Sequence, residues 1–336
     1  EIAFIENRTK LMVMDVKSKK VRQITDGSTW YSTGGGFSYE WSPDGKWFTL
    51  TFCAHHHDPY SDIGLVSADG KGKIVNLTQS GYTSESPRWV LNGNAILFQT
   101  ERFGMRNHAS WGSENDVMLV FLNREAYDKF RMSKEELEIV KAQESKAKEK
   151  ADKEKKEKKD KKEKDTVGQK SNKTDILVEL EGIEDRMVRL TPNSSNLGAA
   201  TISGDGEYLF YLSAFEGGYD LWRMDLRKKE TKLLHKMNTS WSALEMDKSG
   251  KTLFLLNGGR MQKMDLPSGG LTGITYRAEF DLDLAAERAC MFEHVYKQIQ
   301  KRFYVKSLHG VDWGGLKTAY QKFLPHINNN YDFAEL

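Results

Sequence analysis

The sequence predicts a mainly β fold in which β-propeller blades are followed by a small C-terminal α-helical segment. Three observations predict it: a glycine-containing turn signature that recurs at a regular spacing, alternating apolar and polar residues around each copy, and a change to helical periodicity after Tyr276. We therefore expect about five blades or part-blades over residues 1–276, with a charged insertion near residues 133–175, and a helical segment over residues 277–336.

The turn signature is clearest at residues 41–46 (WSPDGK), and weaker copies occur at residues 91–94 (LNGN), 203–207 (SGDGE) and 247–251 (DKSGK). In such a turn, proline fixes φ, aspartate bonds to the nearby backbone, and glycine takes the left-handed conformation. Gly45 and Gly93 are 48 residues apart, and Gly206 and Gly250 are 44 apart. Each copy is therefore predicted to join two strands of a hairpin, once per repeat.

The residues after the first signature supply the other strands of a blade. Alternating residues 46–52 are followed by a candidate strand at 62–66, a second turn at 68–70 and a last strand at 73–78. Later copies agree, with candidate strands at residues 208–212, 219–225, 231–234, 252–256 and 261–265. Four strands in each period are typical of a propeller blade.

A charged stretch interrupts the repeats, because Gly93 and Gly206 are 113 residues apart. Residues 141–165 contain 12 Lys and 8 Asp or Glu and no aromatic residue, which is typical of a solvent-exposed, partly helical segment. A capping box at residues 133–136 (SKEE) marks its start. The stretch carries a net charge of +4 and the whole chain +2, so the remainder carries −2 and nothing indicates nucleic-acid binding.

Helical periodicity begins after Tyr276. Asp283 is the expected cap of a helix from Leu284 to Phe303, whose apolar face holds Phe292, Val295, Ile299 and Phe303. Asp312 is the expected cap of a second helix, lined by Trp313, Leu316, Tyr320 and Leu324. Asp332 is expected to cap a third helix, of which one turn is present, with Phe333 on its apolar side. These uncovered apolar faces lead us to expect that the native protein continues beyond Leu336.

Several classes of protein are disfavoured by what the sequence lacks. No apolar run is long enough for a membrane-spanning helix. Cys53 and Cys290 have no partners at zinc-ligand spacing, so we expect two free, buried thiols. The patterns G-x-S-x-G, H-E-x-x-H and G-x-G-x-x-G and the P-loop are also absent. We therefore expect no cofactor and no metal.

Two loop clusters are the candidate sites. His55, His56, His57 and Asp58 carry metal-ligand side chains, but successive residues of an extended segment point in opposite directions, which favours a polar blade loop closed by Pro59. The second cluster has two interpretations. Its side chains could line a central channel and engage a peptide, or the loop could hold a blade in place through a packed tryptophan, which is the interpretation we favour. It consists of Arg102, Arg106, His108 and Trp111.

The repeat resembles the Tol-type "SPDGK" blade that is shared by Tol-system proteins, prolyl-oligopeptidase relatives and tricorn-like peptidases. Four stretches more specifically resemble tricorn-like serine peptidases of the C-terminal-processing family: residues 102–112 (RFGMRNHASWG), 182–191 (GIEDRMVRLT), 303–313 (FYVKSLHGVDW) and 324–336 (LPHINNNYDFAEL). With the blades, this resemblance covers nearly the whole chain.

The resemblance implies that the propeller and the helical segment precede a peptide-binding PDZ domain and a catalytic domain with a serine nucleophile. The family's catalytic histidine would lie shortly beyond Leu336 and the serine much later, so no catalytic residue maps onto this chain. The expected function is therefore substrate access and scaffolding in a peptidase that acts on peptides or unfolded proteins, and a homo-oligomer is one expected form. Relatives occur both in the cytoplasm and in the envelope of Gram-negative bacteria. Because the Lys-rich insertion of this chain is of the bacterial type, we expect a periplasmic location rather than a cytoplasmic one.

Two other functions remain open from the sequence. A Tol-like propeller could recruit a protein partner without any enzymatic activity, and a prolyl-oligopeptidase-type hydrolase would require a G-x-S-x-G motif further along the protein. The residues downstream of Leu336 discriminate among the three, because a PDZ domain and a serine-bearing domain are expected only for the tricorn-like peptidase.

Overall fold

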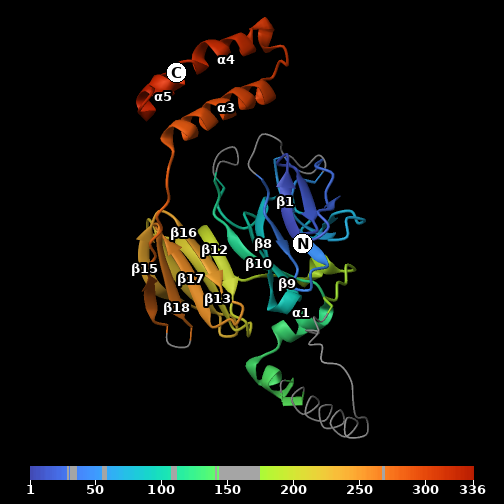
Figure 1. Ribbon diagram of the computed structural model, residues 1–336. Coiled ribbons are helices and arrows are strands. Elements are labelled where there is room, and N and C mark those ends of the chain that lie inside the picture. The colour runs from blue at the N-terminus through green and yellow to red at the C-terminus, as the bar shows by residue number, and fades with distance from the viewer. Residues whose placement is uncertain are drawn as a thin grey trace, which may run out of the picture. The chain divides into compact units, whose positions relative to one another are not determined.

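A computed structural model describes residues 1–28, 30, 36–54, 59–106, 112–140, 142–143, 175–266 and 269–336. The chain forms two compact units, Glu1–Ile274 and Thr275–Leu336. The first contains antiparallel sheets and the second contains helices (Figure 1). The expected fold class, mainly β with a small C-terminal helical segment, is confirmed.

The first unit contains five antiparallel sheets in its described residues, which we number as blades 1 to 5 in chain order. Blade 1 has three strands, β1 (Ile2–Glu6), β2 (Lys10–Met14) and β3 (Val21–Gln23). Blade 2 consists of β4 (Tyr39–Trp41), β5 (Trp47–Phe52), β6 (Asp62–Ser67) and β7 (Val75–Asn76). Blade 3 consists of β8 (Ser84–Val90), β9 (Ala95–Thr100), β10 (Asp116–Phe121) and β11 (Met187–Arg189). Blade 4 consists of β12 (Asn196–Ile202), β13 (Tyr208–Ala214), β14 (Tyr219–Asp225) and β15 (Glu230–Thr239). Blade 5 consists of β16 (Ser242–Met246), β17 (Thr252–Asn257), β18 (Arg260–Asp265) and β19 (Leu271–Ile274).

The turn signature joins the first and second strands of four blades, as its chemistry predicts. In blade 2 the Ser42 hydroxyl donates to Asp44 and accepts from the backbone N–H of Trp47, while Gly45 has a φ of +77°. The copies at Gly206 and Gly250 have φ values of +76° and +69°. The weakest copy, residues 91–94, forms the 3-10 turn η1 (Leu91–Gly93) between β8 and β9.

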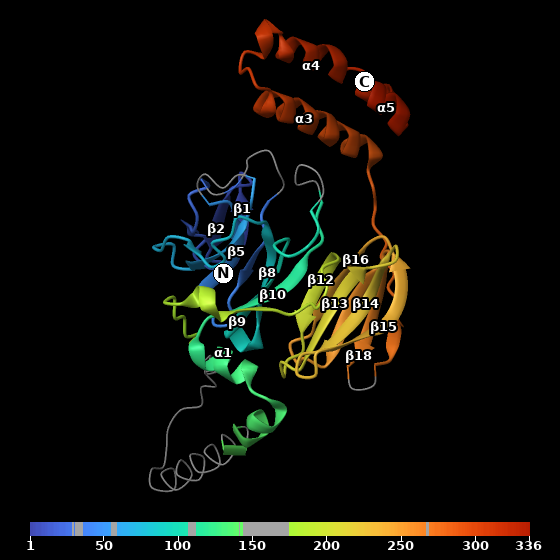
Figure 2. The same cartoon turned by 180° about the vertical axis from the view of Figure 1, so that it is seen from behind.

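Four hydrophobic clusters hold successive blades together, because the central strands bury both of their faces. Along β9, Ala95 and Leu97 pack towards blade 4, whereas Ile96 and Phe98 pack towards blade 2. The other two clusters join blade 1 to blade 2 and blade 4 to blade 5. Blades that follow one another in the sequence therefore pack against one another (Figure 2).

In blades 2 and 3, a buried aspartate ties the third strand to the fourth through a threonine hydroxyl, which the sequence analysis missed. Asp62 accepts hydrogen bonds from the hydroxyl of Thr78 at 2.6 Å and from the side-chain amide of Asn76 at 2.9 Å. Asp116, fully buried, accepts from Thr191 at 2.7 Å and from Ser194 at 2.7 Å. Each threonine also accepts the backbone N–H one residue after its aspartate. These clasps fix the outer strand of the blade.

The charged insertion lies between β10 and β11 of blade 3. The helix α1 (Arg124–Arg131), capped by the Asn123 side chain, comes just before it. Phe130 at the end of α1 packs on Phe121, with ring centroids 5.0 Å apart. The capping box forms as predicted: the Ser133 hydroxyl accepts from the Glu136 N–H, and the Glu136 carboxylate accepts from the Ser133 N–H.

The second unit consists of α3 (Leu284–Arg302), α4 (Trp313–Gln321), α5 (Asn330–Glu335) and the 3-10 turns η4 (Leu308–Gly310) and η5 (Leu324–His326). Asp283 and Asp312 cap α3 and α4 as predicted. The predicted cap of the last helix is wrong: α5 is capped by Asn329, whose side chain accepts from the N–H groups of Tyr331 and Asp332. The helix therefore starts before Asp332, which lies in its first turn.

The helices of this unit pack through few side chains. The buried Arg288 of α3 donates to the carbonyl oxygens of Ile327 and Asn328, which follow η5. Lys317 of α4 pairs with Glu293 of α3 at 2.5 Å. Apolar residues elsewhere on α3 stay in contact with solvent, including Val295, which is 52% exposed.

Candidate functional site

The structure gives no support for a metal centre in the residues that it describes. The predicted cluster His55, His56, His57 and Asp58 lies outside the described residues. In the part of the chain with described coordinates, no group of three or more His, Cys, Asp or Glu side chains could hold a metal ion. No helix among the described residues is long and apolar enough to cross a membrane.

The second predicted cluster lies on a loop between β9 and β10, and two of its residues are described. The Arg106 guanidinium lies 4.3 Å from the centre of the Tyr82 ring, and the Arg106 backbone forms an isolated antiparallel β-bridge with Ser113. The Arg102 guanidinium lies 5.5 Å from the centre of the Phe103 ring. His108 and Trp111 lie outside the described residues. In these contacts, Arg102 and Arg106 pack against their own loop and the loop before β8.

Of the two predicted buried thiols, only one is buried. Neither Cys53 nor Cys290 forms a disulfide, as expected, and Cys53 is buried after β5. Cys290 is exposed on α3, which corrects the prediction. The reason lies in the packing of α3, whose contacts with α4 and the η5 segment are made by Arg288, Glu293 and Tyr296 on another side of the helix.

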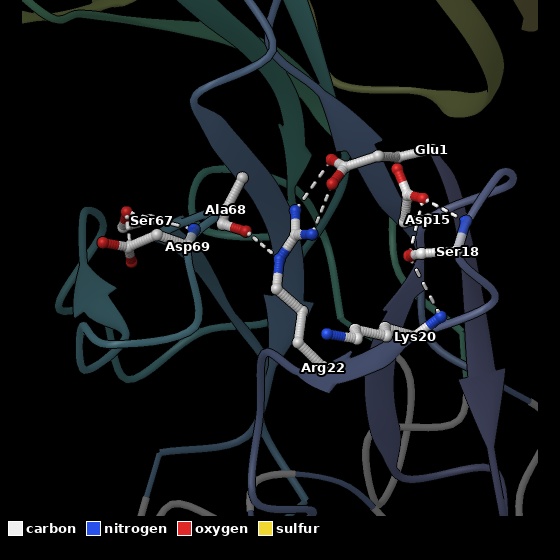
Figure 3. Close-up of polar contacts among 8 residues, drawn as sticks. All are labelled: Glu1, Asp15, Ser18, Lys20, Arg22, Ser67, Ala68 and Asp69. Atoms are coloured by element: carbon white, nitrogen blue, oxygen red, sulfur yellow. Dashed lines mark hydrogen bonds and ion pairs between the residues drawn. The ribbon is translucent and has the colours of Figure 1, made fainter.

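A polar cluster around Arg22 fastens blade 1 to blade 2 (Figure 3). The Arg22 guanidinium on β3 donates to both carboxylate oxygens of Glu1 and, through Nε, to the carbonyl oxygen of Ala68 in the β6–β7 turn. The pKa of Glu1 is lowered, chiefly by the hydrogen bond from Arg22. Because the guanidinium of Arg22 donates its hydrogen bonds to these partners, we interpret the cluster as a structural contact that holds blade 1 against blade 2.

A group of three charged residues lies on the first strands of blades 2, 3 and 5. Glu40 on β4 accepts the backbone N–H of Trp89 at 2.7 Å, and the Trp89 indole N–H donates to the carbonyl oxygen of Glu40 at 3.2 Å. Arg88 on β8 forms an ion pair with Glu245 on β16, with Nη1 and Oε2 separated by 2.8 Å. The same Nη1 lies 3.5 Å from the carbonyl oxygen of Leu244.

Two recesses adjoin Arg88. One, of about 420 Å³, is lined by residues 37–40 and 86–88. The other, of about 100 Å³, is lined by Ser86, Arg88, residues 97–99 and residues 198–200. Neither lining contains a histidine or a cysteine. These walls can therefore bind and orient a polar or charged ligand through ion pairs and hydrogen bonds, but they contain no imidazole or thiol.

Two carboxyl groups near these recesses have raised pKa values. Burial raises the pKa of Glu40, and the Glu245 charge adds to this, while the Trp89 N–H and the Arg88 charge oppose it. Loss of hydration also raises the pKa of Glu85, and the neighbouring Glu101 charge contributes. The Glu85 side chain is nevertheless exposed to solvent, and it does not line either recess.

A larger groove, of about 1040 Å³, lies between the base of the insertion and blade 4. Arg227 after β14 donates to the carbonyl oxygens of Phe130 and Met132, and its guanidinium lies 5.5 Å from the Phe130 ring centre. Burial lowers the pKa of Lys229 in the groove wall, and Arg227 adds to the effect. The contacts of Arg227 are structural, because they secure the insertion to the next blade.

Sequence reasoning missed the Glu40, Arg88 and Glu245 group. Arg88 and Glu245 are 157 positions apart in the chain, and their meeting depends on how the blades pack. The available signal was positional: Glu40 and Glu245 each lie just before a turn signature, and Arg88 precedes another, which places all three on first strands of their blades.

Comparison with known proteins identifies the helical segment and the overall architecture. Residues 284–336 match the family model described as "Tricorn protease C1 domain". A curated protein of Sulfurisphaera tokodaii, a tricorn-like protease C-terminal subunit, is 24% identical over 362 residues. That alignment covers all of this chain and 36% of the relative.

One solved structure has a similar fold along nearly the whole chain. The crystal structure of the tricorn protease matches 97% of this chain with a TM-score of 0.67 at 11% sequence identity, and the chain covers 30% of it. TolB from Acinetobacter baumannii matches 80% of the chain with a TM-score of 0.45 at 14% identity. The resemblance to tricorn-like peptidases, through a propeller region and the start of the helical segment, is thus confirmed.

Proposed function

We propose that this chain is the non-catalytic propeller and helical lead-in of a tricorn-like serine peptidase, and that it provides substrate access and scaffolding for peptide hydrolysis. The observation that carries the proposal is the order of its parts, in which a propeller region is followed directly by a segment matching the tricorn protease C1 domain. The chain spans 36% of the length of its curated relative, so hydrolysis is proposed for the longer protein.

The site geometry is compatible with a role in binding and access. The recesses beside Arg88 offer one carboxylate, a guanidinium and hydroxyl groups, which suit the polar backbone and side chains of peptides or unfolded proteins. We assign no catalytic residue, cofactor or metal to this chain.

The proposal is tested by comparing this chain with the protein from the full reading frame. Both are assayed with fluorogenic peptides and casein, and with a fluorophosphonate that labels reactive serines. We expect turnover and labelling only for the longer protein. Hydrolysis by residues 1–336 alone would contradict the assignment, and a longer protein without activity or labelling would favour the Tol-like binding module.

The proposed location is the periplasm, with the cytoplasm as the alternative. It rests on the Lys-rich insertion at residues 141–165, together with the resemblance to bacterial tricorn-like peptidases stated from the sequence. Fractionation of cells that make the native protein, with a periplasmic and a cytoplasmic marker enzyme, tests this location. Recovery with the cytoplasmic marker alone would overturn it.

A further inference from the structure

Arg88 connects two blades that do not follow one another in the sequence. The hydrophobic clusters pack blade 3 against blade 4 and blade 4 against blade 5. The Arg88 side chain reaches past blade 4 and pairs with Glu245 on the first strand of blade 5. The first strand of each blade is an edge strand of its sheet, and in a propeller such strands surround the central space.

A β-bulge places Arg88 at this point. The pairing of β8 with β9 shifts between Glu85 and Arg88, and Ser86 takes a φ of +56°, a conformation that residues other than glycine rarely adopt. Pro87, which follows, cannot donate a backbone hydrogen bond to the sheet. The bulge re-aims the strand, so that the Nη1 atom of Arg88 lies 2.8 Å from Glu245 Oε2 and 3.5 Å from the carbonyl oxygen of Leu244.

Arg88 and Ser86 line both recesses, so they form the partition between them. The larger recess is bounded by β4 and the smaller one by β9 and β12. Across the partition, Ser38 and Glu40 lie on one side and Gly198 and Ala199 on the other. If the Arg88 side chain moved, the partition would be lowered to Ser86, and one ligand could lie across both recesses along β4, β8 and β12.

The ion pair that holds this partition is weak enough to open. The Arg88 and Glu245 side chains are 35% and 65% exposed, and exposed pairs of this kind contribute at most about 1 kcal/mol and are screened by salt. Glu40 on β4 is a neighbouring charge, because its carboxyl interacts with the charges of both Arg88 and Glu245. Arg88 is the cation in the lining of both recesses, and Glu40 also attracts it.

We infer that the Arg88–Glu245 pair is a releasable crossbar between β8 and β16, and that its release opens a continuous groove that accepts an extended polypeptide. The ligand class rests on the proposed function, whereas the crossbar rests on the contacts alone. While the pair is formed, the Arg88 side chain stands between the two recesses, and each recess on its own is open to small molecules.

Thiol labelling tests the crossbar without any peptidase activity. The full chain carries Ser86→Cys, which is nearly isosteric, and Cys290→Ser, which removes the exposed native thiol. Labelling rates are measured with N-ethylmaleimide and with an uncharged decapeptide that carries a maleimide. We expect Arg88→Ala and Glu245→Gln each to raise the rate for the peptide at least threefold, with little change for N-ethylmaleimide.

Three controls separate the crossbar from general loosening of the fold. The charge-reversed pair Arg88→Glu with Glu245→Arg should restore slow labelling, and Glu216→Gln, which removes the exposed pair with Lys236, should have no effect. Salt at 0.5 M should accelerate labelling of the parent but not of Arg88→Ala. Equal peptide rates in the parent, Arg88→Ala and Glu245→Gln, with unchanged melting temperatures, would overturn the inference. That result would leave the proposed peptidase function untouched, since it is judged by hydrolysis in the longer protein.

Discussion

Trp313 of α4 lies flat on Tyr296 of α3, with ring centroids 5.7 Å apart and ring planes within 3° of parallel. The Trp313 indole N–H also donates to the carbonyl oxygen of Tyr296 at 3.2 Å. Lys317, one turn later on α4, lies 4.6 Å from the centre of the Tyr296 ring. This stack, together with Arg288, explains how a unit of short helices with few buried side chains keeps a defined arrangement.

Replacing Trp313 should therefore loosen the helical unit specifically. A large aromatic residue in a full core costs about 3–5 kcal/mol when cut to alanine, and the half-buried Trp313 should cost about 2 kcal/mol. We expect Trp313→Ala to accelerate hydrogen exchange in α3 and α4, while the blades keep their protection. Trp313→Phe, which keeps the ring contact but loses the N–H donor, should have a smaller effect. Unchanged exchange in Trp313→Ala would show that the stack does not hold the helices.

The buried clasp at Asp116 should contribute strongly to the stability of the blades. Its carboxylate accepts hydrogen bonds from two hydroxyl groups and pairs with Arg189 at 2.8 Å. Because hydrogen bonds to a charged group are worth about 1.5–3 kcal/mol, we expect Asp116→Asn to lower the free energy of unfolding by about 2–3 kcal/mol in urea titrations. The control Asp69→Asn changes an exposed turn carboxylate and should stay within about 0.5 kcal/mol. Equal effects of the two would rule out a special role for the clasp.

The blades could be predicted from sequence because their signals are local. The hairpin signature at residues 41–46 depends on the conformational preferences of proline, aspartate and glycine, and it forms as expected. The clasps were missed, although the dipeptides Leu77-Thr78 and Leu190-Thr191 repeat in the sequence, because Asp116 and Thr191 are separated by the whole insertion. The misplaced cap of α5 has a different cause, since Asn329 and Asp332 are both good caps and only the chain path selects one.

The candidate site could not be predicted for a geometric reason. The alternation of Glu40, Arg88 and Glu245 with apolar neighbours shows that they lie on strands, but not which blades approach one another. Residues 117–121 form a continuous apolar run, and in the structure they belong to a strand that is buried on both faces. From periodicity alone, such a run could equally be a buried helical segment.

Glu40 should make stability depend on pH. Its pKa is raised in the folded protein, chiefly by burial, so folding favours the protonated carboxyl. Any stability from this group is fully present below the unfolded pKa of 4.5 and is lost as pH rises through the higher folded value. Glu40→Gln removes the buried charge and keeps an oxygen to accept the Trp89 N–H. We expect its urea midpoint to exceed that of the parent more at pH 7 than at pH 4; a difference that does not vary with pH would contradict this.

The residues that lead into the insertion, around Phe130, should contribute to stability, whereas residues 141–170 should not. Phe130 packs on Phe121, and the Arg227 guanidinium lies 5.5 Å from the Phe130 ring centre, so Phe130→Ala should cost about 3 kcal/mol. Replacing residues 141–170 with a short flexible linker should instead lower the melting temperature by no more than a few degrees, because their composition offers almost nothing to a core. Calorimetry of the two variants tests this difference, and a large loss on deleting residues 141–170 would show that they pack.

The uncovered apolar side chains of the helical unit should drive self-association of this chain. Val295 and Ile299 of α3 are 52% and 36% exposed, and Leu316 and Tyr320 of α4 are 39% and 45% exposed. Covering such half-exposed side chains is worth on the order of 1 kcal/mol each, so several together can favour a dimer at micromolar concentrations. We expect residues 1–336 to sediment with a concentration-dependent mass, and a truncation ending at Gly273 to remain monomeric. Val295→Asp with Ile299→Asp should abolish the association, whereas Gln300→Asp on the same helix should not. A monomer at high concentration, with α3 and α4 protected from hydrogen exchange, would show that the exposed face does not self-associate.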